Sequence, residues 1–259
     1  MMERYLKRLF SALFSALVGG VVIYIVLAIS EWNTDKQPSV KENQQEVIQP
    51  KATQEPLIQP VNRAVKESHP LSHYDTIMRN DAIGQNAYAK VDYYMLALSW
   101  SPAFCESQIQ KYGNSLPDSS KMQCGMQRKY GWVIHGLWPQ KMHARSVSDH
   151  PRFCQGDLPQ LDYAVIEPYL AESPSPHLLQ GEWEKHGACA FKTADGYFKK
   201  QRELYRTLRL PTEALPVKNL FRWMKMHNPQ LRNANMQASR SELFICYDLR
   251  WKVVNCPSR

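Results

Sequence analysis

Apolar residues are distributed unevenly along this chain and divide it into three parts. Leu9 to Ile29 forms an uncharged, mostly apolar run that follows a short basic stretch. A helix of this length would extend about 31 Å, close to the hydrocarbon thickness of a bilayer. We therefore expect residues 1–30 to hold a cytoplasmic basic stub and a transmembrane signal anchor, with the rest of the chain exported.

Cleavage of this segment as a signal peptide is the alternative. The run is longer than the core of about 7–15 residues that is usual in a cleavable signal, which favours an anchor. Ala28-Ile29-Ser30 nevertheless places small residues at a spacing that a signal peptidase uses. Both interpretations put the remaining chain in the periplasm or outside the cell.

A polar, Pro- and Gln-rich segment at residues 31–88 is predicted to be a flexible linker. Its central part, Asp35 to Glu67, is rich in Gln, Glu, Lys and Pro and contains no aromatic residue. Such a composition cannot bury enough apolar surface to offset the entropy lost on ordering. Residues 69–90 are compatible with either the linker or the edge of the domain that follows.

The folded domain is expected at residues 89–259. The almost wholly apolar segment Asp92–Trp100, which stops at Pro102, is typical of a buried central strand. Gly131–Ile134 predicts a second short strand that delivers His135 at its end.

Two amphipathic helices and a hairpin complete the domain. Apolar positions predict one helix over Thr193–Leu210 and another from Val217 to the stop at Asn228-Pro229. Leu243–Tyr247 and Trp251–Cys256 flank a short turn and predict a hairpin. Strands and helices without a βαβ rhythm indicate an α+β domain with an antiparallel sheet core.

All six cysteines lie in this domain, which supports export. An even cysteine count in an exported chain is best explained by disulfide bonds. A zinc site is the alternative, but the chain contains no Cys-x-x-Cys pair. Because six cysteines allow about fifteen pairings, closeness in sequence does not settle the partners. The six are Cys105, Cys124, Cys154, Cys189, Cys246 and Cys256.

The charge of the chain is also concentrated in the domain. The formal net charge is +8, and 22 of the 32 Lys and Arg but only 15 of the 24 Asp and Glu lie in residues 91–259. A basic folded domain attracts polyanions through steering and counterion release. A merely soluble basic surface would carry the same charge.

Candidate acid/base groups occur in the segment Glu182-Trp183-Glu184-Lys185-His186-Gly187. If the segment is helical, Glu182, Lys185 and His186 share one face because they are spaced i, i+3 and i+4. A carboxylate, an ammonium and an imidazole then address one ligand, while Glu184 lies on the opposite side and needs no role. An ordinary helix face with a polar pair explains the same spacing.

A second histidine, His135, lies in the segment Trp132–Pro139. Its ordinary pKa of about 6.5 lets an imidazole accept or donate a proton near neutrality. One histidine can therefore take a proton from an attacking group while another protonates a leaving group. Trp138 offers a surface on which a base can stack. Taken singly, such a histidine is usually a satisfied polar residue and such a tryptophan is usually core.

Taken together, the two segments resemble the active-site segments of the ribonuclease T2 family. The resemblance extends from about Tyr93 to Cys256 and leaves the first ninety residues outside. Leu98–Cys105 resembles the first core strand of the family, and Cys246-Tyr247-Asp248 with Asn255-Cys256-Pro257 resembles its last hairpin.

This resemblance implies an endoribonuclease that cleaves single-stranded RNA without a metal or other cofactor. It implies that His186 takes the proton of the ribose 2′-hydroxyl and that His135 protonates the departing 5′-oxygen. Lys185, with Glu182, would stabilise the negatively charged phosphorane. The expected product is a 2′,3′-cyclic phosphate, which a slower step opens to a 3′-phosphate.

The resemblance also suggests the disulfide pairing. Cys154–Cys189 and Cys246–Cys256 would be bridges shared across the family, which leaves Cys105–Cys124 as the third pair.

Two positions depart from the family pattern. Many members carry a third histidine immediately before the catalytic glutamate, where this chain has Gly181. The expected consequence is slower turnover or weaker substrate binding. Many members also have an acidic residue after the position of Pro139, where this chain has Gln140-Lys141. Base preference therefore does not transfer.

Two other classes of function compete with this interpretation. An inactive RNA-binding or interaction module would need none of the four acid/base groups, and their presence argues against it. A metal-dependent nuclease or phosphatase usually gathers several Asp and Glu, whereas the two segments supply only Glu182 in a suitable place. The expected partners are the single-stranded RNA substrate and the membrane, which the N-terminal helix would contact. The sequence indicates no protein partner.

Overall fold

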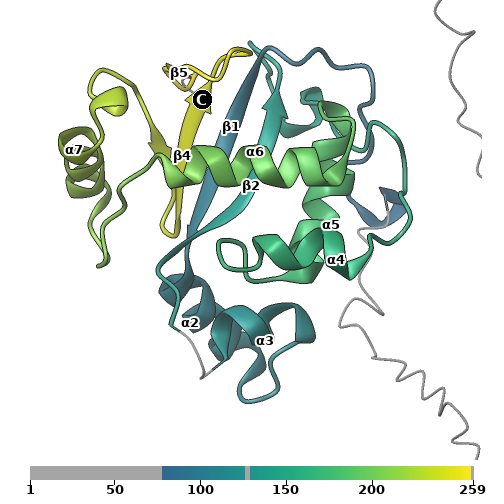
Figure 1. Cartoon of the computed structure of the whole chain (residues 1–259), viewed down its shortest axis with the longest axis horizontal. Helices are drawn as coiled ribbons and strands as arrows, with labels where there is room; N and C mark the ends of the chain where they lie inside the picture. The colour runs from purple at the N-terminus through teal and green to yellow at the C-terminus, as the bar shows by residue number, and fades with distance from the viewer. Residues whose placement is uncertain (1–77, 126–128, 258–259) are drawn as a thin grey trace, which may run out of the picture. The chain divides into compact units, whose positions relative to one another are not determined.

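The computed structural model describes residues 78–125 and 129–257 (Figure 1). The predicted signal anchor and most of the predicted linker lie outside the described residues. Within the described ranges, no helix is both long and apolar enough to cross a membrane.

An antiparallel sheet forms the centre of the domain, and five strands belong to it in the described part of the chain. Strand β1 lies between β2 and β4, while β3 and β5 pair with successive parts of the other edge of β4. The α+β class with an antiparallel core, as predicted, is confirmed. The strands are β1 (Tyr93–Trp100), β2 (Trp132–Gln140), β3 (Gln237–Ala238), β4 (Glu242–Tyr247) and β5 (Val253–Val254).

Helices cover one face of the sheet and lie beyond both of its sides. Figure 1 shows α6 crossing the sheet, α4 and α5 on the side of β2, and α7 on the opposite side. The helices are α2 (Ser101–Tyr112), α3 (Asp118–Cys124), α4 (Tyr163–Ile166), α5 (Pro176–Lys185), α6 (Ala194–Arg206) and α7 (Val217–His227).

The main hydrophobic core lies between the sheet and these helices. Leu96 and Leu98 of β1 are fully buried against Leu179 of α5 and against Tyr197 and Phe198 of α6. Both predicted amphipathic helices are confirmed. Helix α6 begins after the capping side chain of Thr193 and ends earlier than predicted, at Arg206, while α7 ends immediately before Asn228-Pro229.

Strand β2 differs from the prediction in a way that matters for the site. The strand predicted at Gly131–Ile134 does not end before His135 but continues to Gln140, so that boundary was wrong. Ala97 pairs with Gly136 and Leu98 with Ile134, which leaves His135 without a partner on β1. This β-bulge adds one residue to the strand and reverses the alternation of its side chains.

The effect of the bulge is visible in the core. Trp132, Ile134 and Leu137 all belong to the main core, although regular alternation would have placed Gly136 there. Trp138 then packs with the smaller apolar cluster on the other face of the sheet. Because Ile134 points into the main core, His135 faces the second side of the sheet, and the bulge brings Gly136 and Trp138 onto that same side.

The structure also corrects the prediction for the segment that follows β1. The resemblance treated Leu98–Cys105 as one strand, but β1 ends at Trp100 and helix α2 starts at Ser101 with Pro102 in its first turn. Proline is favoured there because the first helical N–H groups have no partner within the helix.

All three predicted disulfides are confirmed: Cys105–Cys124, Cys154–Cys189 and Cys246–Cys256. The first joins α2 to α3, and the last joins β4 to the segment after β5. The second joins the loop after residue 152 to the short 3-10 turn Gly187–Cys189, directly after His186.

Residues 78–88, which precede the predicted start of the domain at residue 89, also contact it. The Met78 backbone N–H donates to Asp157, and Asn86 forms an antiparallel bridge with Arg152.

Replacing Cys154 and Cys189 together by alanine is expected to lower the free energy of unfolding by about 2–4 kcal/mol. The bridge closes a separation of 35 residues and so restricts the unfolded chain. Urea denaturation without reductant measures the loss. The matched control removes Cys246–Cys256, with a separation of 10 residues, and should lose less. Equal losses in the two variants would contradict this explanation.

Candidate active site

A groove with a volume of about 850 Å³ lies over the second face of the sheet. Tyr93 and Met95 of β1 contribute to its apolar lining. Both predicted active-site segments reach it, although they are about fifty residues apart in sequence. The polar and aromatic residues that line it include His135, Trp138, Arg152, Glu182, Lys185 and His186.

Helix α5 sets the positions of Glu182, Lys185 and His186. It starts at the side-chain cap of Ser175, whose hydroxyl accepts the Leu178 N–H at 3.2 Å. It ends at Lys185, and His186 follows with non-helical backbone angles. Glu182 and His186 remain one turn apart, so both side chains enter the groove as the i, i+4 spacing predicted.

Glu184 is the one residue of this segment whose assignment needs correction. The helical spacing predicted it on the side opposite Glu182, with no role, but its side chain is fully buried. Its carboxylate accepts a hydrogen bond from the backbone N–H of Leu158 and so attaches α5 to the preceding loop.

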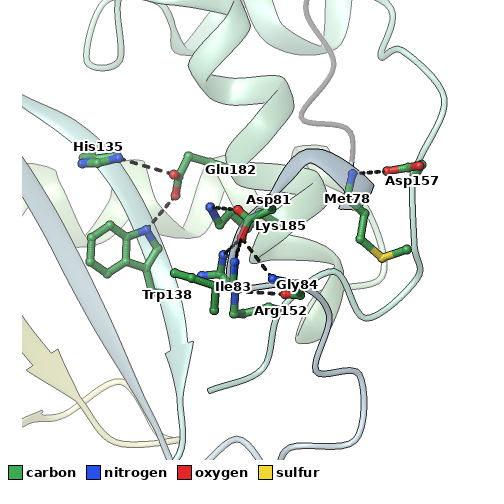
Figure 2. A network of polar contacts seen from close by, with 10 residues as sticks. All are labelled: Met78, Asp81, Ile83, Gly84, His135, Trp138, Arg152, Asp157, Glu182 and Lys185. Carbon is green, nitrogen blue, oxygen red and sulfur yellow. Dashed lines mark hydrogen bonds and ion pairs between the residues drawn. The ribbon is translucent and has the colours of Figure 1, made fainter. Parts of the chain in front are cut away.

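The Glu182 carboxylate lies at the centre of the site (Figure 2). One oxygen accepts the indole N–H of Trp138 at 2.7 Å, and the other lies 3.4 Å from Nε2 of His135. A Cβ atom at Gly136 would overlap the Glu182 carboxylate. Only glycine at this position of β2 therefore lets the helix and the strand approach closely enough for these contacts.

Burial alone would raise the pKa of Glu182. The charges of His186 and His135 and the hydrogen bonds from His135 and Trp138 outweigh that effect and lower the pKa below its ordinary value. Glu182 is therefore an ionised carboxylate at neutral pH.

His135 is held as an imidazolium. Its Nδ1 donates to Oε1 of Glu242 at 2.7 Å, and Glu182 lies on its other side. Burial lowers the pKa of His135, but the hydrogen bonds and charges of the two carboxylates together raise it to about 10. About a third of the side chain stays exposed, so its proton is accessible from the groove.

His186 has the opposite protonation. Burial lowers its pKa to about 4, and the charges of Arg152, Lys185 and His135 act in the same direction against the opposing charge of Glu182. Its Nδ1 is buried without a hydrogen-bond partner among the described residues. At neutral pH His186 is therefore a neutral imidazole and His135 an imidazolium, the pattern that separates a base from an acid.

Trp138 occupies the space between the two histidines. Its ring centroid lies 5.2 Å from that of His135 and 5.6 Å from that of His186, and Phe244 packs against it as well. Its indole N–H is used to hold Glu182. The stacking of a base on this ring stays a prediction.

Lys185 belongs to a cluster of charged side chains that the sequence did not predict. Its ammonium lies 2.6 Å from Oδ2 of Asp81, and Oδ1 of Asp81 accepts from Arg152 at 2.8 Å. Asp81 comes from a segment whose composition gave no signal for the site. Glu242 was also not predicted from the sequence as a site residue. In the sequence it is only an acidic residue immediately before the predicted strand Leu243–Tyr247.

Within residues 78–125 and 129–257, no group of three or more His, Cys, Asp or Glu side chains is arranged to hold a metal ion.

Comparison with known proteins places these residues in a family. Residues 91–230 match the model of the Ribonuclease T2 family. Over 196 residues the chain is 62% identical to a probable ribonuclease of Haemophilus influenzae, covering 76% of this chain and 72% of that protein. A ribonuclease of Aeromonas hydrophila is 36% identical over 99 residues, or 38% of each chain.

Among solved structures, the RNase-related protein from Calystegia sepium is similar to this chain with a TM-score of 0.49 and 20% identity, over 66% of this chain and 93% of that one. The family match spans more than half of the sequence and contains both histidine segments. The chain therefore belongs to the ribonuclease T2 family of enzymes.

Proposed function

We propose that this protein is an exported, metal-independent endoribonuclease that cleaves single-stranded RNA through a 2′,3′-cyclic phosphate. The observation that carries the proposal is the placement of His135 and His186 in one groove on either side of Trp138, in surroundings that shift their pKa values in opposite directions. A reaction that removes a proton at one oxygen and adds one at another needs such a pair at the same pH.

His186 is the general base in this mechanism. Its imidazole is neutral above about pH 4 and can take the proton of the ribose 2′-hydroxyl. The 2′-oxygen then attacks the adjacent phosphorus, and the bond from phosphorus to the 5′-oxygen breaks. In the second step water opens the cyclic ester, the two histidines exchange roles, and a 3′-phosphate remains.

His135 is the general acid. Glu242 and Glu182 stabilise its imidazolium and fix the direction of the ring. The departing 5′-alkoxide is a stronger base than imidazole even when the pKa of His135 is raised to about 10, so the proton transfers as the P–O bond breaks.

Lys185, with Glu182, stabilises the phosphorane. The ammonium supplies a fixed positive charge on the groove wall, where it can face the extra negative charge that develops on the phosphate oxygens. Glu182 has a second task, because it connects Trp138 to His135 and so holds the acid in its place.

Three disulfides support the exported location that we propose. Disulfides form and persist in the periplasm and outside the cell, and they are rare in the reducing cytosol. The apolar run at residues 9–29 is proposed to anchor this catalytic domain to the membrane.

The purified protein is expected to cleave single-stranded RNA with excess EDTA present and to leave DNA of the same sequence intact, because DNA lacks the 2′-hydroxyl. His186→Ala should reduce the rate by about 10²–10⁴-fold, the usual contribution of a general base. His227→Ala, a histidine of α7 that does not line the groove, is the matched control and should stay active.

Cleavage that stops in EDTA and returns with added metal would contradict the metal-independent mechanism. An absence of cleavage by the wild-type protein at pH 5–7 under all conditions would favour the inactive binding module instead.

The pH profile of kcat/KM for a dinucleotide substrate should rise near pH 4 and fall near pH 10. The base must be deprotonated, so its lowered pKa sets the acid limb, and the acid must be protonated, so its raised pKa sets the alkaline limb. His135 is faced by Glu182 and Glu242, and His186 by Glu182, Arg152, Lys185 and His135.

Glu242→Gln removes one of the two charges that stabilise the His135 imidazolium. The pKa of His135 should fall, and the alkaline limb of the profile should move to lower pH while the acid limb stays in place. Movement of the acid limb alone would contradict the assignment of His135 as the acid.

Protein isolated from membranes is expected to retain residues 1–30, as an uncleaved anchor requires. Mass spectrometry of the N-terminal peptide measures this. An N-terminus close to Ser30 would replace the anchor by a cleaved signal peptide and leave the export of the domain unchanged.

A further inference from the structure

A turn formed by Asp81–Gly84 contacts Lys185 and Arg152 of the groove wall, although it precedes the match to the family model, which starts at residue 91. The Gly84 N–H donates to the Asp81 carbonyl at 3.1 Å, and Gly84 has a φ of +76°, which glycine adopts without strain. The Gly84 carbonyl in turn accepts from Nε of Arg152.

The chain on both sides of this turn is fixed to the domain. On one side, Met78 N–H donates to Asp157 at 2.6 Å. On the other side, Asn86 exchanges two backbone hydrogen bonds with Arg152, at 3.0 and 3.1 Å. The position of Asp81 is therefore determined by its neighbours in sequence as well as by its own side chain.

The Asp81 carboxylate accepts hydrogen bonds on both oxygens. Oδ2 accepts from the Lys185 ammonium at 2.6 Å, and Oδ1 accepts from Arg152 at 2.8 Å and from the Ile83 N–H at 2.9 Å. Burial would raise the pKa of Asp81, but these hydrogen bonds and the two cations lower it well below its usual range. Asp81 is therefore ionised wherever the enzyme works.

Asp81 has a clear effect on the two cations beside it. Arg152 is almost completely buried and needs a counter-ion, because an unpaired buried charge is strongly unfavourable. Lys185 carries its charge on a flexible four-carbon chain that would otherwise sample several positions. The Asp81 carboxylate is shared by Lys185 and Arg152. The three groups together carry one net positive charge, which is held at a fixed place in the groove wall.

We propose that Asp81 is a positioning residue that holds the Lys185 ammonium where it stabilises the phosphorane. Figure 2 shows Asp81 between Lys185 and Arg152, with Glu182 on the same helix as Lys185. The inference rests on the proposed function, in which Lys185 faces the scissile phosphate. It assigns part of the active site to a segment that precedes the residues matched to the family.

The same contact could instead block the site, with Asp81 occupying the place of the phosphate. The structure favours positioning, because a carboxylate bound by two cations and a backbone N–H, in a turn anchored on both sides, is not a group that leaves readily. The two roles predict opposite effects of its removal.

Asp81→Asn keeps the size and one acceptor oxygen but removes the charge. We expect kcat to fall about 10- to 100-fold, as for other small displacements of a catalytic group, while KM for a dinucleotide changes less than about threefold. Asp157→Asn is the matched control, because it removes a charge beside the same segment without a contact to Lys185, while the asparagine oxygen can still accept the Met78 N–H. Its kcat should stay within about twofold of the wild-type value.

A double-mutant cycle separates positioning from a general structural role. Lys185→Ala should be slow, and adding Asp81→Asn to it should slow it no further, because Asp81 acts through Lys185. An equal additional loss in the Lys185→Ala background would overturn the inference. So would a rise in kcat, or tighter inhibition by inorganic phosphate, in the Asp81→Asn variant.

Asp81→Glu keeps the charge and moves the carboxylate by one methylene. If Asp81→Asn does not remain folded, the same double-mutant cycle is measured with Asp81→Glu. The outcomes also separate the two proposals. Without RNA cleavage by the wild-type protein, the proposed function fails. With a cleaving wild type, a slow Lys185→Ala variant and an unaffected Asp81→Asn variant, only the present inference fails.

Discussion

The close contact between helix α5 and strand β2 is the constraint on which the site depends. Gly136 lets the Glu182 carboxylate reach across the strand, where Trp138 donates to it and His135 lies beside it. The bulge at His135 is the second half of the same arrangement, because it places Gly136 and Trp138 on the same face of the sheet as the imidazole. Without either feature, the two active-site segments would still be present in the chain but would not form one groove.

The groups around the two histidines explain how identical side chains acquire different protonation. His135 is between two carboxylates, so its charged form is stabilised despite burial. His186 is more deeply buried and has cations near it, and the single charge of Glu182 does not compensate. A low local dielectric enlarges both effects, since a charge inside a protein acts more strongly than one in water. The acid and the base of the proposed mechanism are therefore products of their surroundings.

The position of the Lys185 ammonium depends on an ion pair with a segment outside the two active-site segments. Its partner Asp81 comes from a turn that precedes the residues matched by the family model, and the turn is fixed by backbone hydrogen bonds to Arg152. The disulfide Cys154–Cys189 joins that same loop to the turn after His186. The loop at residues 152–154 thus connects the segment before the family match to the segment Glu182–His186, which carries three of the four proposed catalytic groups.

The sequence by itself determined the elements whose signals are local or repeated: the buried strand Tyr93–Trp100, the amphipathic helices, the hairpin and the two histidine segments. The disulfide pairing came from the family resemblance, because six cysteines alone leave it open. Only the tertiary structure decided the bulge at His135 and the roles of Glu242, Asp81 and Arg152. Periodicity records which face of an element is apolar, whereas the register of a strand and the partner of a charge depend on residues distant in sequence.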